Sequence, residues 1–171
     1  MTAAGTQTRL QVPGNAHRDL PVREAEVAPI IAAVDGSPAN TVAVQAAVNL
    51  AGELDAPVVF VYVRRGPADF LGAPVYQRRL TAEMARGRRV LDEALEAAAV
   101  AGVTAEGEIL EGSPRRRITE FARDRGARLV VVGSRRRKVG RSVSRGVALA
   151  SGRPVVVAQG LHRLALAGKA A

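Results

Sequence analysis

Basic side chains are the residues of this sequence best suited to chemistry, and they gather in one segment. Between Ser113 and Gly146 there are twelve arginines and lysines against two acidic residues, while the whole 171-residue chain has a formal net charge of +9. A focused basic surface attracts phosphate groups, whether on a nucleotide, a nucleic acid or a membrane. The alternative interpretation is a solvated arginine face without a ligand. Both interpretations stay open at this point.

Residues that could build a catalytic or metal centre are few. The chain has no cysteine, which excludes a thiolate metal site and a cysteine nucleophile. Its two histidines, His17 and His162, fall in the terminal segments, away from any predicted buried serine. The acidic residues lack metal-ligand spacing, and the sequence has neither a Walker phosphate loop nor an SGGxDS-like loop. We predict a non-catalytic protein with no metal site, and only slow ATP hydrolysis stays open.

Short apolar runs predict the strands that would position a ligand. They are residues 29–34, 57–63, 128–132 and 154–158, with a weaker and more alternating run over 103–111 that suits a sheet edge. Uninterrupted β-branched runs are typical of parallel strands covered on both faces. The segments between them carry apolar residues at helical spacing. This order predicts one α/β domain, a Rossmann-like open parallel sheet with helices on both faces.

The predicted topology also indicates where a ligand would bind. In such sheets ligands lie beyond the carboxyl ends of strands, where the strand order reverses. That rule points to Asp35, to the residues after Val63 and to the loop at Gly133. Two of the helices are expected to begin at Ser37-Pro38 and Ser113-Pro114, with the serine as N-cap and the proline in the first turn.

The two ends of the chain differ from its middle. Residues 1–28 mix Gly, Pro, Thr, Gln and both charge signs without periodicity, so we expect a disordered tail. Residues 161–171 are expected to form a C-terminal tail, with a short helical turn around Leu161, Leu164 and Leu166. The predicted domain therefore spans residues 29–160.

Four motifs in this order resemble the universal stress protein family. They are Val34-Asp35-Gly36-Ser37, Glu111-Gly112-Ser113-Pro114, Val132-Gly133-Ser134 and Arg153-Pro154-Val155-Val156-Val157. Each motif is weak alone, but the ordered set is fairly specific and covers about residues 29–160. The resemblance implies five strands in the order 3-2-1-4-5 and a homodimer formed through the fifth strand.

The resemblance also implies an adenine nucleotide site. Ala33, Asp35 and Val63 would line the adenine and ribose pocket, with Asp35 accepting a hydrogen bond from the nucleoside. Val132 leads into Gly133, which matches the first glycine of the family's phosphate motif. The alternatives are a turn residue at Asp35, a tight turn at Gly133 and a core position at Val63.

The rest of the phosphate motif departs from the family pattern. Gly146 fits the third glycine of the motif at the correct separation. The alternative role of Gly146 is to allow close packing of a helix. Arg136 replaces the second glycine. Val147 stands where a serine or threonine is usual. Arginine cannot adopt positive φ without strain, and valine donates no hydrogen bond. Neighbouring arginines could still hold phosphate oxygens by charge and bidentate bonding. The expected ligand is ATP, with Mg²⁺ only alongside it, while AMP and cyclic AMP stay open.

Three functions compete on these residues. The first is a cytoplasmic, dimeric stress-response regulator that binds an adenine nucleotide. The second is an interaction module of the same fold that has lost nucleotide binding. The third is a basic nucleic-acid-binding protein, which the scarcity of aromatic side chains for base stacking disfavours.

Partners and location follow from the apolar segments. The strand over Pro154–Ala158 is expected at a sheet edge, which a twin strand or, failing that, the segment after Gly160 would cover. No stretch approaches the roughly 20 apolar residues of a membrane span, and no signal peptide is recognised. We therefore expect a cytoplasmic homodimer without a membrane span.

Overall fold

The computed structural model describes residues 27–64, 73–134, 143–159 and 163–167. Helices and strands alternate through most of this part of the chain. The elements are β1 (Ile30–Val34), α1 (Asn40–Leu54), β2 (Val58–Arg64), α2 (Ala73–Val100), β3 (Ala105–Glu111), α3 (Pro114–Asp124), β4 (Leu129–Gly133), α4 (Val143–Ala150), β5 (Val155–Gln159) and β6 (Arg163–Ala167). The predicted tail over residues 1–28 falls almost entirely outside the described residues.

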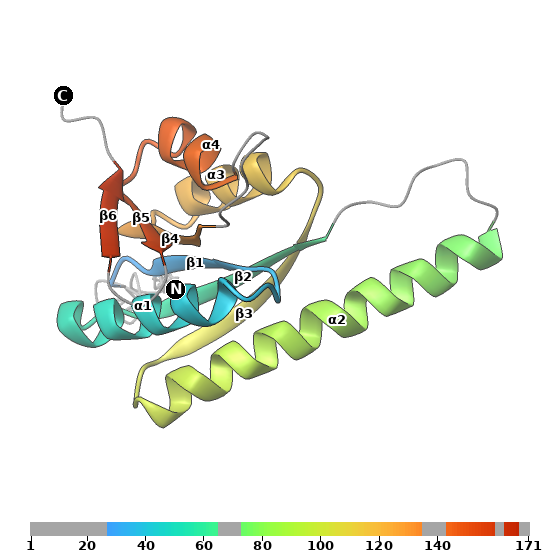
Figure 1. Ribbon diagram of the computed structural model, residues 1–171, viewed down its shortest axis with the longest axis horizontal. Helices are drawn as coiled ribbons and strands as arrows, with labels where there is room; N and C mark the ends of the chain where they lie inside the picture. The colour runs from blue at the N-terminus through green and yellow to red at the C-terminus, as the bar shows by residue number, and fades with distance from the viewer. Residues whose placement is uncertain (1–26, 65–72, 135–142, 160–162, 168–171) are drawn as a thin grey trace, which may run out of the picture.

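A single sheet forms the middle layer, and its strands run in the order β3-β2-β1-β4-β5-β6. The first five are parallel, which confirms the predicted order 3-2-1-4-5 and places the weak run over 103–111 at an edge. Helices α1 and α2 cover one face and α3 and α4 cover the other (Figure 1). The fold is the α/β Rossmann-like sheet that the sequence predicts.

Two hydrophobic cores lie on the two faces of the sheet, because alternate residues of each strand point to opposite sides. Ile30, Phe60 and Val131 pack under α1 and α2, and Ile31 and Val130 pack under α3 and α4; all five are 0% exposed. Strands buried on both faces explain why the apolar runs show no alternation with polar residues. The cores hold the carboxyl ends of the strands in fixed register.

Strand β6 corrects the sequence prediction for the C-terminal segment. The expected helical turn is wrong, because Arg163–Ala167 pair antiparallel with β5, from Val155↔Ala167 to Gln159↔Arg163. The unpaired N–H and C=O groups along β5 offer hydrogen bonds that an isolated helical turn cannot match. The edge over Pro154–Ala158 is therefore not free for a twin strand, and a segment after Gly160 covers it.

Candidate functional site

The candidate site lies at the carboxyl ends of β1, β2 and β4. Strand β1 pairs with β2 on one side and β4 on the other, and Ala33 is in register with Val61 and Val132. Crossovers leave in opposite directions from this point, which is where sheets of this kind bind their ligands. Ala33, Val63 and Gly133 are half-buried at this edge, and Asp35 is exposed. The structure thus brings the predicted adenine-side residues together.

A network of side-chain hydrogen bonds shapes the turn that follows β1. The backbone N–H of Ser37 donates to Oδ1 of Asp35 at 2.9 Å, and the N–H of Asp35 donates to Oδ1 of Asn40 at 3.1 Å. Gly36 adopts φ +66°, which favours glycine, and a Cβ atom there would lie 2.8 Å from Cγ2 of Val90. The predicted turn role of Asp35 is confirmed, and its contact with a nucleoside stays a prediction.

Ser37 has a different place from the one predicted. Helix α1 begins at Asn40 with Ala39 as N-cap, and no side chain caps it, so the expected Ser37 cap is wrong. Asp35 already accepts the Ser37 N–H, which closes a turn two residues before the helix starts. The Ser37 hydroxyl is buried and has no hydrogen-bond partner among the described residues. Sequence reasoning missed this buried hydroxyl because a serine before a helix resembles a cap.

The second predicted cap is partly right. Ser113 stands at the N-cap of α3 with extended backbone and Pro114 follows in the first turn, as expected, but the Ser113 side chain makes no capping hydrogen bond. The Ser113 carbonyl instead accepts the Arg117 N–H at 2.9 Å. The first turn of α3 therefore depends on backbone bonding and proline geometry.

Gly133 ends β4 in extended backbone, so the turn alternative does not explain it. A Cβ atom at this position would lie 3.0 Å from the carbonyl oxygen of Ala39. The glycine therefore lets the end of β4 approach the segment that leads into α1. Packing against Ala39 thus explains why this position is a glycine. Contact with a phosphate stays a prediction.

The other predicted positions on the phosphate side differ in whether the structure describes them and in how deeply they are buried. Arg136 lies outside the described residues. Val147 is 0% exposed and Val132 is 2% exposed, both within the core under α3 and α4. Their side chains are therefore closed to a ligand. Val63 is also packed against this core, as its alternative interpretation anticipated.

Gly146 faces the side chain of Arg115, which comes from the first turn of α3. A Cβ atom at position 146 would lie 2.6 Å from Cδ and 3.1 Å from Nε of Arg115. Close packing of the two helices at Gly146, one of the predicted alternatives, is thus observed. Arg115 was counted in the basic segment, but no sequence pattern links it to a glycine thirty-one positions later. The structure adds it to the candidate site.

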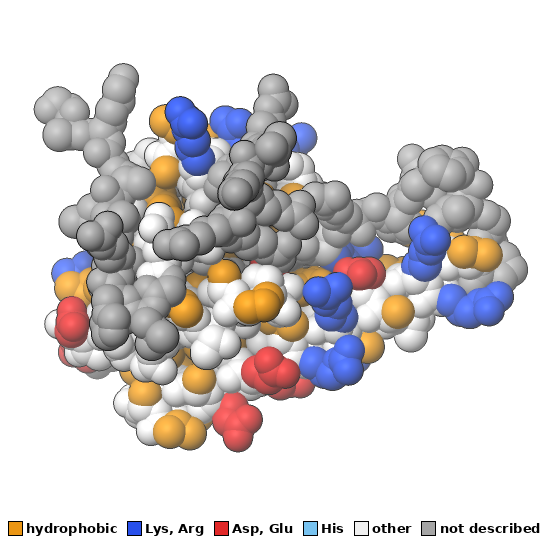
Figure 2. All heavy atoms as spheres, in the orientation of Figure 1, with side chains coloured by type: hydrophobic (Ala, Val, Ile, Leu, Met, Phe, Trp, Pro, Cys, Tyr) orange, Lys and Arg blue, Asp and Glu red, His pale blue; other side chains and the backbone are white. Residues whose placement is uncertain are grey.

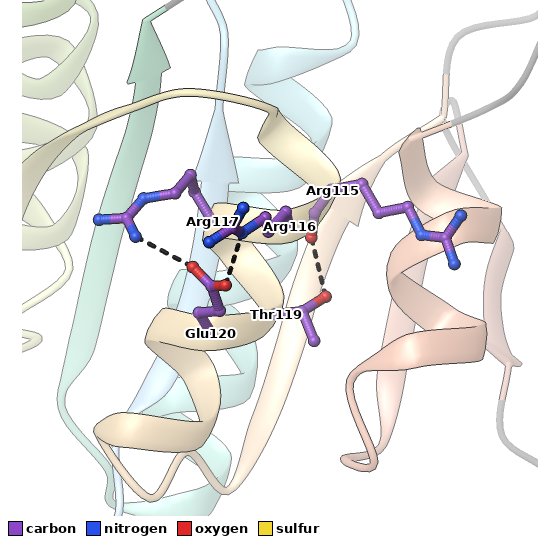
Figure 3. A network of polar contacts seen from close by, with 5 residues as sticks. All are labelled: Arg115, Arg116, Arg117, Thr119 and Glu120. Carbon is purple, nitrogen blue, oxygen red and sulfur yellow. Dashed lines mark hydrogen bonds and ion pairs between the residues drawn. The ribbon is translucent and has the colours of Figure 1, made fainter.

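Ion pairs neutralise part of the basic segment. Arg116 Nε and Arg117 Nη1 contact the Glu120 carboxylate at 2.7 and 3.0 Å (Figure 3). Arg125 reaches out of the segment to Glu106 and Glu108 of β3, at 3.0 and 3.2 Å. Counting charges along the sequence misses these carboxylates of β3. On the face drawn in Figure 2, the basic side chains of the described residues lie over several elements and do not form one patch.

The β2 side of the edge has its own polar contacts. Tyr62 donates from its hydroxyl to Oε2 of Glu83 at 3.3 Å, and Arg64 pairs with Glu111. Burial, followed by the negative charge of Glu83, raises the pKa of the Tyr62 phenol. These contacts connect the carboxyl end of β2 with α2 and β3.

Metal and membrane sites were sought in the described part of the chain. Within it, no three His, Asp or Glu side chains gather closely enough to hold a metal ion. None of its helices is both long and apolar enough to cross a bilayer.

Comparison with known proteins identifies the family. The profile of the universal stress protein family matches residues 27–159. The chain belongs to the universal stress protein family. A universal stress protein of Methanocaldococcus jannaschii is 34% identical over 108 residues, which are 61% of this chain and 63% of that relative's length. A universal stress protein of Bacillus subtilis is 32% identical over 115 residues, 62% of this chain and 78% of that protein.

Solved structures agree with this assignment. A universal stress protein from Lactobacillus plantarum superposes with a TM-score of 0.69 at 27% identity, covering 78% of this chain and 99% of that chain. A universal stress protein solved in complex with cAMP superposes with a TM-score of 0.64 at 25% identity, covering 81% of this chain and 99% of that chain. The universal stress protein fold thus accounts for most of the chain.

Proposed function

We propose that this universal stress protein is a non-catalytic regulator that binds an adenine nucleotide at the carboxyl ends of β1, β2 and β4. The observation that carries the proposal is that Ala33, Asp35 and Gly133 lie at the carboxyl ends of β1 and β4, where the strand order reverses. The cAMP complex of a relative with 25% identity supports an adenine nucleotide as the ligand class.

The adenine side of this site is better formed than the phosphate side. The Asp35 carboxylate accepts the Ser37 N–H and the Asp35 backbone N–H donates to Asn40, so a nucleoside would meet an oriented carboxylate. Val147 offers no hydroxyl, and its side chain is buried. We therefore propose ATP, AMP or cyclic AMP as ligands, with Mg²⁺ present only when bound phosphates bring it.

Calorimetric titration with ATP and Mg²⁺, AMP and cyclic AMP tests the proposal. We expect heat of binding from the wild-type chain and weaker binding by about tenfold in Asp35→Asn, which loses a charged acceptor. The amide keeps an oxygen for the Ser37 N–H, so the turn is retained. Asp92→Asn, on the exposed surface of α2, is the matched control. No heat or thermal shift at millimolar ligand would overturn the proposal.

A second candidate is an interaction module of the same fold without a nucleotide. The burial of Val147 favours it, because the usual hydroxyl beside the phosphate is missing. Retained ATP affinity that falls in Gly133→Ala would count against this candidate. The substitution must also be checked by thermal unfolding, since the new Cβ would meet Ala39 at 3.0 Å.

Assembly and location complete the proposal. We propose a cytoplasmic protein, and a homodimer through residues 154–158 would require β6 to leave β5. Nucleic acid is not the proposed partner, because the chain has few aromatic side chains for base stacking and three arginines of the basic segment are paired with glutamates. A DNA mobility shift at low salt would contradict that exclusion.

A further inference from the structure

Arg115 is fixed in α3 at its backbone, and its aliphatic stem packs over Gly146 of α4. Its carbonyl oxygen accepts a hydrogen bond from the Thr119 hydroxyl at 2.8 Å, and Thr119 is buried. Its Cγ, Cδ and Nε atoms lie over Gly146, where a Cβ would come within 2.6 to 3.2 Å of them. A side chain at position 146 would displace the arginine. The missing Cβ therefore gives the Arg115 side chain a path across α4.

The guanidinium of Arg115 differs from its neighbours in its pairing. Arg116 and Arg117 turn toward Glu120, while Arg115 extends the opposite way, across the neighbouring helix (Figure 3). No ion pair or hydrogen bond to this guanidinium occurs among the described residues. The residue is exposed. Its five N–H donors are thus presented to solvent beside α4.

Topology places the first turn of α3, which carries Arg115, at the same edge of the sheet as the candidate site. Helix α3 follows the carboxyl end of β3, and α4 must run from the carboxyl end of β4 back to the start of parallel β5. The first turns of both helices therefore lie at the carboxyl edge. Arg115 is in the first turn of α3, and Gly146 is in the first turn of α4.

We propose that Arg115 is the phosphate-recognising residue of this site and sets its preference for phosphorylated nucleotides. The inference rests on the proposed function. Val147 has no hydroxyl for a phosphate, whereas a guanidinium beside Gly146 can donate two parallel N–H···O bonds to one. This arginine is supplied by α3.

Charge on the ligand should decide how strongly Arg115 contributes. Adenosine carries no phosphate, cyclic AMP carries one negative charge, and AMP and ATP carry more. A guanidinium gains most from a dianionic phosphate that offers two free oxygens. The expected order of dependence on Arg115 is therefore ATP and AMP first, cyclic AMP next and adenosine last.

Calorimetric titration of Arg115→Gln with AMP, cyclic AMP and adenosine tests the inference. We expect AMP affinity to fall about tenfold or more, cyclic AMP affinity to fall less and adenosine affinity to stay at the wild-type value. Arg116→Gln is the matched control, because it removes the same charge from the neighbouring residue, whose guanidinium is paired with Glu120. Thermal unfolding checks that each variant is folded, and Arg115→Lys, which keeps the charge, should lose less.

The outcomes separate this inference from the proposed function. If the wild-type chain binds AMP and Arg115→Gln binds it with the same affinity, the role of Arg115 is overturned and the proposed nucleotide site is retained. Equal losses in Arg115→Gln and Arg116→Gln overturn it too, since they indicate general electrostatics. No binding of any of the three ligands by the wild-type chain overturns the proposed function itself.

A second variant tests the placement of Arg115 by Gly146. Gly146→Ala introduces the Cβ that would lie 2.6 Å from Cδ of Arg115, so the stem must move. We expect weaker AMP binding in the wild-type background and little further loss in the Arg115→Gln background. Losses that simply add in the double variant would show that Gly146 acts without Arg115.

Discussion

The Tyr62 phenol shows how one buried hydroxyl links the sheet to a helix. The side chain is 5% exposed, and its hydroxyl donates to Glu83 of α2. Burial and the nearby carboxylate raise the pKa of the phenol above the ordinary value of 10.0. The folded chain therefore keeps the phenolic proton at a pH where the unfolded chain releases it, and alkaline pH destabilises the fold.

Replacing Tyr62 by Phe should reduce this alkaline sensitivity. The stabilisation that the protonated Tyr62 phenol gives the wild-type fold is complete below 10.0, the ordinary pKa of the phenol in the unfolded chain. It is lost as pH rises through the higher pKa of the phenol in the folded chain. At neutral pH the variant should lose about 0.5 to 1 kcal/mol with the hydrogen bond. Urea unfolding at neutral and strongly alkaline pH measures both effects, and Tyr76→Phe is the control. An equal loss of unfolding free energy at alkaline pH in the wild-type chain and in Tyr62→Phe would contradict the expectation.

Single residues of the site were predictable where a local pattern carries them. Asp35 and Gly133 follow apolar runs, so their place at strand ends could be read from the order of the chain. The packing of Arg115 over Gly146 and the burial of the Ser37 hydroxyl were not predictable. Their surroundings are set by packing between α3 and α4 and by a turn that starts α1 two residues later than expected.

Helix α2 shows how small residues fix the position of a whole element. Its 28 residues span about 42 Å and project past the sheet in Figure 1. Contact with the sheet is made where glycine permits it. A Cβ atom at Gly87 would lie 2.8 Å from Cδ1 of Tyr62 and 3.2 Å from Cδ1 of Ile109. The described side chains of α2 that are buried all lie from Gly87 onward.

Gly87→Ala should therefore destabilise the domain despite the better helix propensity of alanine. Overpacking against the Tyr62 ring costs about 1 to 3 kcal/mol, and alanine recovers only about 1 kcal/mol in a helix. Gly52→Ala in α1 is the matched control, because no atom lies within 4 Å of its new Cβ. It should stabilise the chain by up to about 1 kcal/mol. Chemical denaturation measures both, and stabilisation by both substitutions would contradict this account of α2.

Elements were more predictable than their ends. The five parallel strands and four helices follow from apolar periodicity, because burial on both faces of a sheet leaves a clear sequence pattern. Helix α1 starts at Asn40 and not beside Ser37, since a side-chain bond within the preceding turn competes with capping. Strand β6 depends on the β5 edge it pairs with, which its own five residues do not reveal.

The two edges of the sheet determine how the whole molecule meets other chains. At one edge, β3 carries Glu106 and Glu108, whose charges are paired with Arg125. Charged side chains on an edge strand discourage pairing with another sheet. At the other edge, β6 covers the apolar strand β5 along five residue pairs. Association through β5 is thus opposed by a strand of the same chain.

Removing residues 160–171 should uncover β5 and make the protein associate. The truncated chain would expose the unpaired backbone groups of Val155–Gln159, which a second copy can satisfy by strand pairing. Light scattering at micromolar concentration should then give a larger mass than for the full chain. A chain that lacks only residues 168–171 keeps β6 and is the control. Equal masses for all three chains would show that β6 does not govern association. If that equal mass is the mass of a dimer, the interface lies away from β5.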